Sequence, residues 1–225
     1  MDRKTYALIE NYMHACMGDT AHDREHVRRV LYQALAIAKT EMPVNLDVLI
    51  AACLLHDIGR REQFENPAVC HAMVGGEKAY QFLVQQGFSE DYARQVRHCV
   101  ETHRYRKRSP PQSMEAKILF DADKLDVAGA VGIARTLLYK GIVGEPLYSL
   151  RTDGTVSDGD GDEASSFFQE YKYKLENLYG KFYTKRAAEI ALERRQAAVD
   201  FYNSLYREVS ALYQSGKDEL DKAVQ

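Results

Sequence analysis

The sequence predicts an all-α protein, and three observations lead to that fold class. Apolar residues recur with helical spacing along most of the chain, residues suited to cap helices precede several of these stretches, and little of the chain alternates with the period of a strand. A clear i, i+3, i+4 stripe is formed by Val27, Val30, Leu31, Ala34 and Ala38. We therefore expect a compact helical bundle with additional helices towards the C-terminus.

The most apolar helix is expected near residues 46–58. Asn45 is a suitable N-cap, Asp47 lies in the first turn, and Gly59 is a natural stop. Residues 48–55 are apolar on every side, which indicates a helix buried on most of its surface. A run this short also fits a buried strand, but its alanines and helical neighbours favour a helix.

Further helices are expected at about 69–86, 90–103, 115–140, 164–179 and 184–213. Ser89 and Thr184 are suitable N-caps, and Pro110-Pro111 precedes the third of these helices. We expect a single all-α domain over residues 1–225, with its main bundle at about 20–145 and C-terminal helices at 164–214.

Residues 144–163 break the helical pattern, because they are rich in aspartate and glycine. Asp158, Asp160 and Asp162 resemble the start of a calcium loop. However, Glu163 and Gln169 stand where such a loop needs glycine and a bidentate glutamate. We interpret the segment as an exposed acidic loop that can also act as a lid.

Composition excludes several classes of partner and location. The formal net charge of -3 provides no overall basic field for nucleic acid or an anionic membrane, and the longest apolar run is too short to span a bilayer. The four cysteines form no C-x-x-C pair and fit free thiols in a reducing compartment better than disulfides. We expect a soluble, cytoplasmic protein that binds neither nucleic acid nor membrane.

Three polar segments carry residues that can bind a metal ion. They are His26 within H-D-R-E-H-V-R-R-V, the doublet His56-Asp57 after the most apolar helix, and Asp123 within D-A-D-K-L-D. Imidazole and carboxylate suit Zn, Fe, Mn, Ni or Mg to differing degrees. A lone histidine on a helix is usually structural. An adjacent His-Asp pair at the polar end of an apolar helix is different, because a buried charge needs a partner or a cation.

These segments resemble the HD superfamily of metal-dependent phosphohydrolases. The similar motifs are H-D-x-x-H-x-x-R-V at residues 22–30, A-x-L-L-H-D-I at 52–58 and D-A-D-[KR]-L-D-x-x-G-A-x-G-I-A-R at 121–135. The likeness covers about residues 20–145, which we take as the HD-domain core, and continues more weakly into the C-terminal helices. The last motif is much more specific than the doublet.

The resemblance implies that the metal ligands are His26, His56, Asp57 and Asp123. Asp121 and Asp126 are the rivals of Asp123. Because Asp126 lies about one helical turn after Asp123, it can instead orient a ligand from the second coordination shell.

The resemblance also implies roles for residues around the metal. His71 and His103 match two histidines that bind a second ion in some HD enzymes. We prefer one ion, with both imidazoles binding phosphate or transferring protons, and keep two as the alternative. Glu62 is a candidate proton acceptor. Arg29, Arg60 and Lys124 are candidate phosphate contacts, and for Arg29 ordinary surface charge is an equal alternative.

The function we expect is hydrolysis of a phosphate ester or anhydride of a small nucleotide by metal-activated water. The ion can be Mn, Mg, Fe, Ni or Zn, and the sequence does not define the oligomeric state. Two alternatives are a di-iron oxygenase of the same superfamily and a non-catalytic nucleotide-binding regulator. The intact ligand set argues against the regulator.

Overall fold

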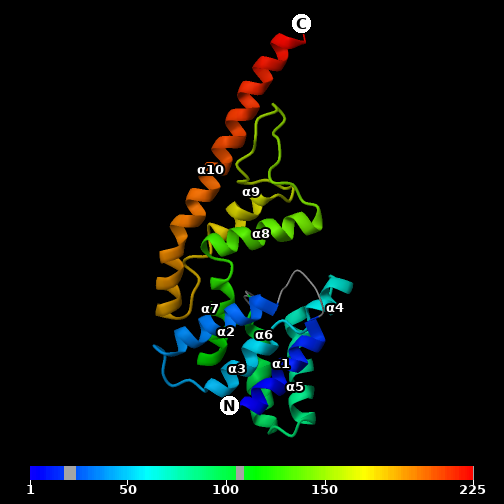
Figure 1. Cartoon of the computed structure of the whole chain (residues 1–225), viewed down its shortest axis with the longest axis vertical. Helices are drawn as coiled ribbons and strands as arrows, with labels where there is room; N and C mark the ends of the chain where they lie inside the picture. The colour runs from blue at the N-terminus through cyan, green and yellow to red at the C-terminus, as the bar shows by residue number, and fades with distance from the viewer. Residues whose placement is uncertain (18–23, 105–108, 225) are drawn as a thin grey trace. The chain divides into compact units, whose positions relative to one another are not determined.

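The computed structural model describes residues 1–17, 24–104 and 109–224, and within them every regular element is a helix (Figure 1). The strand-like pairing in this part of the chain is one isolated bridge between Leu150 and Val156. The predicted all-α fold class is therefore confirmed. Among the described residues, no helix is long and apolar enough to cross a membrane.

The chain divides into two compact units. The first comprises Met1–Asp126 together with Phe182–Ala187, and the second comprises Val127–Lys181 together with Ala188–Gln225. The single domain expected over residues 1–225 stays a prediction.

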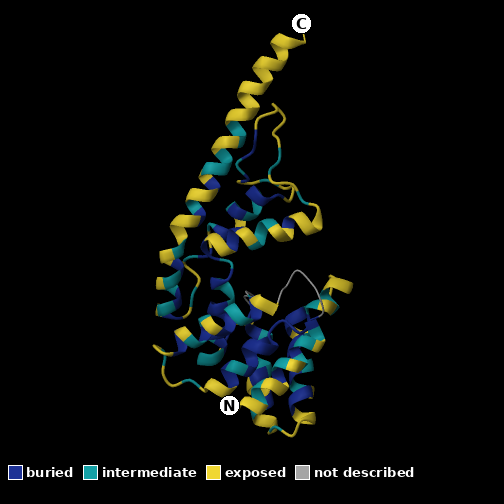
Figure 2. Cartoon of the chain, in the orientation of Figure 1, coloured by how far each residue is buried: buried dark blue, intermediate teal, exposed yellow. Residues whose placement is uncertain are grey.

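The first unit is built around one buried helix. Its helices are α1 (Arg3–Met17), α2 (Arg24–Ala38), α3 (Leu46–Leu55), α4 (Arg60–Glu65), α5 (His71–Gln85), α6 (Glu90–Thr102) and α7 (Met114–Leu125). Helix α3 contacts α1, α2, α6 and α7, and most of its residues are fully buried (Figure 2). The predicted cap is also present, because the Asn45 side chain accepts hydrogen bonds from the backbone N–H groups of Asp47 and Val48. An amphipathic helix would leave one face in water, and the all-apolar surface of α3 explains its central place.

The turn between α3 and α4 packs unusually close to the start of α5. A Cβ atom on Gly59 would lie 2.3 Å from the carbonyl oxygen of His71 and 2.7 Å from the backbone nitrogen of Gly75. Only glycine allows the two backbones to approach so closely. Gly59 thus brings the turn that carries His56 and Asp57 next to His71.

The second unit contains α8 (Gly129–Val143), the short α9 (Phe167–Glu170), a π-helical stretch, η1 (Tyr171–Leu175), and the part of α10 (Lys185–Ala223) that follows Ala187. Its core is aromatic: the rings of Tyr171 and Tyr202 stack with centroids 4.0 Å apart, and Phe168 contacts Tyr202 edge-on. These contacts hold α9 and η1 against α10.

The long helix expected at 115–140 is two helices instead, α7 and α8. Gly129 has φ of +66°, and a Cβ at this position would lie 2.9 Å from the carbonyl oxygen of Arg194. The left-handed backbone and the close approach both require glycine, so the chain turns here. The helix expected at 164–179 is likewise shorter, and the last helix extends to Ala223.

Residues 144–163 form a loop that is held by hydrogen bonds and ion pairs within the chain. The Asp162 carboxylate accepts hydrogen bonds from the hydroxyls of Ser149 and Ser157, and Asp158 pairs with Arg151 at 2.9 Å. Val156 and Ser157 are buried, although most of the segment is exposed. Two of the three aspartates that resemble a calcium loop thus have partners within the chain.

Candidate metal centre

Five helix ends of the first unit bring the candidate ligands together. His26 lies in the first turn of α2, His71 begins α5, and Asp123 lies in the last turn of α7. His56 and His103 are the C-caps of α3 and α6. Helix ends carry backbone groups without intrahelical partners, so polar side chains can be held there with little disruption of the core.

The first group of ligand atoms is formed by His26, His56, Asp123 and one oxygen of Asp57. The Nε2 atoms of His26 and His56 are 3.3 Å apart, and Asp123 Oδ1 lies 3.3 Å from the first and 4.0 Å from the second. Asp57 Oδ2 lies 3.5 Å from His26 Nε2 and 3.6 Å from His56 Nε2.

These separations suit a single divalent ion. Nitrogen and oxygen ligands bind such ions at about 2.0–2.2 Å, so neighbouring ligand atoms around one ion lie roughly 3.0–3.6 Å apart. Four of the five measured separations fall in this range, and Asp57 Oδ2 is buried without a hydrogen-bond partner among the described residues. A buried carboxylate oxygen without a partner is costly, and a cation would satisfy it. The donor set therefore fits a metal.

A second group lies on the other oxygen of the same carboxylate. Asp57 Oδ1 is 3.5 Å from His71 Nε2 and 3.7 Å from His103 Nε2, and these two nitrogens are 3.3 Å apart. All three residues are buried. The structure thus brings His71 and His103 into the site, and Asp57 lies between the two groups.

All four imidazoles are held through Nδ1, which leaves Nε2 directed into the groups. His26 Nδ1 donates to Asp126 Oδ2 at 2.7 Å, and His71 Nδ1 to the amide oxygen of Gln63. The two C-cap histidines donate to carbonyl oxygens three residues earlier, those of Cys53 at 2.8 Å and Val100 at 2.6 Å. A bond from one ring nitrogen defines the tautomer and the orientation of a metal-binding imidazole.

The electrostatics of the site favour a positive charge at its centre. Burial acts to lower the pKa of His26, but the adjacent carboxylates of Asp123, Asp126 and Asp57 outweigh it and raise that pKa to about 10. Burial acts to raise the pKa of Asp57 and of Asp123, yet nearby Arg60 in the first case and His26 in the second hold these pKa values well below the usual range. Without an ion, a proton on His26 supplies the missing charge.

The imidazoles of the second group are neutral, because burial outweighs the effect of the nearby carboxylates. Burial is the main cause that lowers the pKa of His71 to about 2 and that of His103 to about 4. The adjacent guanidinium of Arg60 lowers the pKa of His71 further. Neutral imidazole is the form that binds metal ions.

Asp126 and Arg29 hold His26 of the first group in place through a chain of hydrogen bonds. The Arg29 guanidinium donates to both oxygens of Asp126, from Nε at 2.8 Å and from Nη2 at 3.1 Å, and Asp126 in turn binds His26. The role of Asp126 in the second coordination shell stays a prediction. For Arg29 the contact orients a carboxylate, and contact with phosphate stays a prediction.

The other residues expected near the metal, Arg60, Lys124 and Glu62, make separate contacts. Arg60 donates from Nε to Asp57 Oδ1 at 2.8 Å, so it lies at the edge of the second group. The Lys124 ammonium lies 4.0 Å from the centroid of the Phe120 ring. Glu62 pairs with Lys78 at 2.6 Å, and its other oxygen is buried without a partner among the described residues. Glu62 is not a member of either group of potential ligands found in this part of the chain.

Asp121, a rival of Asp123 in the sequence, has a structural position instead. Its carboxylate accepts hydrogen bonds from the backbone N–H groups of Tyr183 and Thr184 and from the Thr184 hydroxyl, at 2.7–3.1 Å. It therefore binds the chain just before α10 and contributes no atom to either group.

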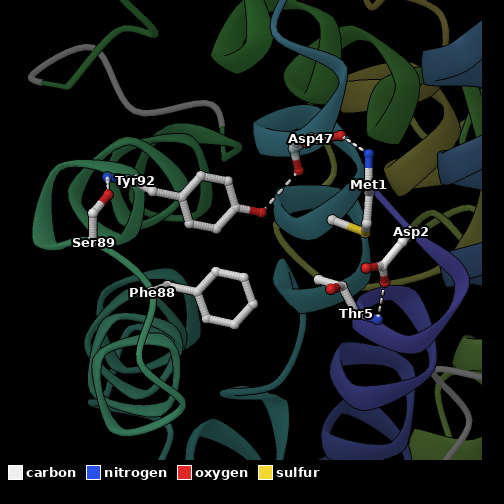
Figure 3. Close-up of a pocket in the computed structure, with 7 residues that line it drawn as sticks. All are labelled: Met1, Asp2, Thr5, Asp47, Phe88, Ser89 and Tyr92. Atoms are coloured by element: carbon white, nitrogen blue, oxygen red, sulfur yellow. Dashed lines mark hydrogen bonds and ion pairs between the residues drawn. The ribbon is translucent and has the colours of Figure 1, made fainter.

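A cavity of about 460 Å³ in the same unit is lined by none of these ligands. Its lining residues lie at the starts of α1, α3 and α6 or just before α1 and α6, and Figure 3 shows them as sticks. Its two carboxylates have partners, because Asp47 pairs with the amino group of Met1 and Asp2 accepts from the backbone of Thr5. We do not assign the site to this cavity.

Comparison with known proteins agrees with this geometry. Residues 24–128 match the model of the HD domain. The uncharacterized protein YpgQ of Bacillus subtilis (strain 168) is 30% identical over 210 residues, which are 91% of this chain and 93% of that protein. The chain belongs to the HD-domain family. The resemblance seen in the sequence is thereby confirmed.

Solved structures resemble this HD-domain protein over nearly its whole length. A protein from Lactobacillus plantarum matches with a TM-score of 0.73 and 26% identity, covering 94% of this chain and 99% of that one. Bacillus subtilis YpgQ in complex with ADP matches with a TM-score of 0.70 and 25% identity, covering 91% and 97%. A predicted HD superfamily hydrolase from an uncultured Thermotogales bacterium matches with 0.60 and 29%, covering 92% of each.

Sequence reasoning missed three kinds of contact at this site. It did not identify Gln63 as the partner of His71, Lys78 as the partner of Glu62, or the backbone carbonyls behind His56 and His103. The position of a histidine directly after an apolar helix is a usable signal for the carbonyl contacts, because the last carbonyls of a helix need donors. We find no such signal for Gln63.

Proposed function

We propose that this HD-domain protein is a metal-dependent phosphohydrolase that hydrolyses a phosphate ester or anhydride of a small nucleotide. The observation that carries the proposal is the first group: two imidazole nitrogens and two carboxylate oxygens spaced for one ion, with Asp57 Oδ2 buried and without a hydrogen-bond partner among the described residues. The fold shared with HD superfamily hydrolases supports a hydrolytic activity.

The proposed ligands are His26, His56, Asp57 and Asp123. A divalent ion held by them supplies Lewis acidity, because it makes water more acidic and neutralises charge on phosphoryl oxygens. Asp126 holds His26 in the tautomer that presents Nε2, and Arg29 holds Asp126. These contacts keep the donor atoms in place before the ion binds.

The remaining polar residues are suited to the phosphate. Arg60 contributes a fixed positive charge beside Asp57, and guanidinium groups bind phosphate oxygens through paired hydrogen bonds. Lys124 follows the proposed ligand Asp123 directly and contributes a second cation. His71 and His103 are neutral and buried beside Asp57, where they can exchange a proton with water or substrate.

A nucleotide is the substrate class that relatives support. Bacillus subtilis YpgQ, 30% identical to this chain, has been solved in complex with ADP. We therefore propose a nucleoside phosphate as the ligand and place no nucleic acid or membrane among the partners. The four free cysteines are consistent with the cytoplasmic location that we propose.

The test is a turnover screen on metal-reconstituted protein. Nucleoside mono-, di- and triphosphates would be supplied with Mn²⁺, Mg²⁺, Fe²⁺, Ni²⁺ or Zn²⁺ in turn, and inorganic phosphate and pyrophosphate would be measured separately. We expect release of one of these products to depend on the ion and on Asp57. A protein that binds the ion but releases neither product from any nucleotide would contradict the proposal.

The second group gives one alternative function a specific basis. Two irons would supply oxygen activation, and His71, His103 and Asp57 would hold the second of them. We prefer hydrolysis with one tightly bound ion, because the Arg60 guanidinium already bonds the oxygen of Asp57 that a second ion would need and so weakens binding there. Iron content and oxygen consumption separate the two functions.

A further inference from the structure

The second group depends on one residue that can act either as a donor or as an acceptor. Three of the four imidazoles bond through Nδ1 to groups that only accept: the Asp126 carboxylate for His26 and backbone carbonyls for His56 and His103. When neutral, these rings must carry their proton on Nδ1 and a lone pair on Nε2. His71 is different, because its partner is the side-chain amide of Gln63.

The side-chain amide of Gln63 can accept a hydrogen bond through its oxygen or donate one through its NH₂ group. If the Gln63 oxygen meets Nδ1, His71 carries its proton there and presents a lone pair at Nε2. If the amide NH₂ meets Nδ1, the proton moves to Nε2, which then donates to His103 Nε2 at 3.3 Å. The first state directs three acceptors at one point, from His71, His103 and Asp57 Oδ1, and it requires a positive charge there. The second state requires none.

The structure has the oxygen of Gln63 on His71 Nδ1. We propose that Gln63 is a positioning residue that holds His71 in the Nδ1–H tautomer, so that His71 Nε2 is an acceptor for a second, weaker-binding cation. The inference deepens the proposed function, because it concerns the group that shares Asp57 with the proposed resident ion. Under it, His71 does not donate a hydrogen bond to phosphate from Nε2.

Two substitutions of Gln63 distinguish the effect of its hydrogen-bond acceptor from the effect of its side-chain volume. Gln63→Leu removes the acceptor. Gln63→Glu keeps an acceptor and removes the donor, so it should preserve the tautomer. The matched control is Glu65→Leu, which places the same leucine in α4 at an exposed position whose carboxylate pairs with Arg61. Circular dichroism and melting curves establish that all three variants fold.

The first measurement is the tautomer of His71 in metal-free protein, read from ¹⁵N chemical shifts and long-range ¹H–¹⁵N couplings. We expect the Nδ1–H form in the wild type, in Gln63→Glu and in Glu65→Leu. Gln63→Leu should change to the Nε2–H form, because donation to His103 is then the available bond. An Nε2–H form in the wild type, or an unchanged tautomer in Gln63→Leu, would overturn the inference.

The second measurement is Mn²⁺ binding by titration calorimetry without substrate. The wild type should show two binding events, and Gln63→Leu should weaken the weaker event by roughly 10–100-fold while leaving the stronger one unchanged. Gln63→Glu should show the weaker binding event with the affinity of the wild type. One event in the wild type at saturating Mn²⁺, or equal binding by Gln63→Leu, would contradict the inference. Neither measurement involves turnover, so loss of the inference and failure of the hydrolysis assay remain distinguishable.

Discussion

At the scale of single residues, each imidazole has one nitrogen in a supporting hydrogen bond and the other in the candidate site. Each of the four rings bonds through Nδ1 and directs Nε2 into one of the two groups, and Asp57 directs one oxygen to each group. Such support matters because a ring that can rotate or change tautomer binds an ion less tightly. The consequence is that contributions of ligands and of their supports can be measured separately.

Replacing Asp57 with alanine should remove the bound ion and abolish turnover. One oxygen of this carboxylate lies beside each group, and in the group with His71 and His103 it is the one carboxylate found in the described part of the chain. Metal content by elemental analysis and turnover on the best nucleotide are the measurements. Asp91→Ala, an exposed carboxylate of α6, is the control and should behave as the wild type. An Asp57→Ala protein with full metal and activity would show that the doublet has been wrongly assigned.

Three aspartates of the D-A-D-K-L-D motif should differ in their effects. Asp123→Asn should reduce metal content most, because its carboxylate belongs to the first group. Asp126→Asn should weaken metal affinity by roughly 10–100-fold through His26. Asp121→Asn should leave metal affinity unchanged. Titration of each variant with Mn²⁺ ranks them, and any other order would move the ligand to another aspartate.

At the scale of elements, the site is an arrangement of helix ends. Their carbonyls hold two of the imidazoles, and a glycine in the turn after α3 lets this turn approach α5. The same unit uses Asp121 of α7 to receive the chain before α10. We therefore expect stability and metal binding to depend on different residues of one short motif.

Asp121→Ala should destabilise the fold without changing the metal site. The substitution leaves the backbone N–H groups of Tyr183 and Thr184 without their acceptor, and a buried donor left unsatisfied costs about 1–3 kcal/mol. The free energy of unfolding from a urea titration should fall by this amount, with unchanged metal stoichiometry. Asp123→Ala is the contrasting variant, with lost metal. Unaltered stability in Asp121→Ala would contradict the anchoring role.

Gly59→Ala should lower the free energy of unfolding by about 1–3 kcal/mol, the usual cost of overpacking. The new methyl group would meet the backbone of α5 at His71 and Gly75, which cannot move as a flexible side chain can. Gly141→Ala is the matched control in α8, where a Cβ meets no atom within 4 Å. It should stabilise by about 0.5–1 kcal/mol, because alanine is the better helix former. Equal effects of the two substitutions would contradict the close packing.

At the scale of the whole molecule, all proposed ligands lie within the unit Met1–Asp126. Each lies in a helix or directly after one, and the ligand residues span positions 26 to 123. Unfolding this unit therefore disperses these side chains, and binding of an ion by them would be coupled to folding.

Metal binding should raise the melting temperature of the wild type. An ion at 100 times its Kd adds about 2.7 kcal/mol of stability, which corresponds to a shift of about 5–10 °C for a protein of this size. Scanning calorimetry with Mn²⁺ and with a chelator measures the shift. Asp57→Ala should melt at the same temperature in both, and an equal response of this variant and the wild type would place the ion elsewhere.

The sequence by itself determined the fold class and the buried helix α3. It also indicated His56, Asp57 and Asp123 as candidate ligands. Apolar spacing and caps depend on neighbours along the chain, so α3 and its Asn45 cap could be predicted. His56 and Asp57 stood out because ionisable residues directly follow an apolar helix. The family motif then indicated Asp123 as the fourth ligand.

Only the tertiary structure decided which residues far apart in the sequence contact one another. Gln63 faces His71 because Gly59 lets two backbones approach, and Asp121 rather than Asp123 receives the chain before α10. The break at Gly129 likewise depends on the backbone of Arg194, which is 65 positions later in the chain. Local patterns do not encode such contacts, because each arises when separate helix ends pack against one another and leave buried polar atoms that must be paired.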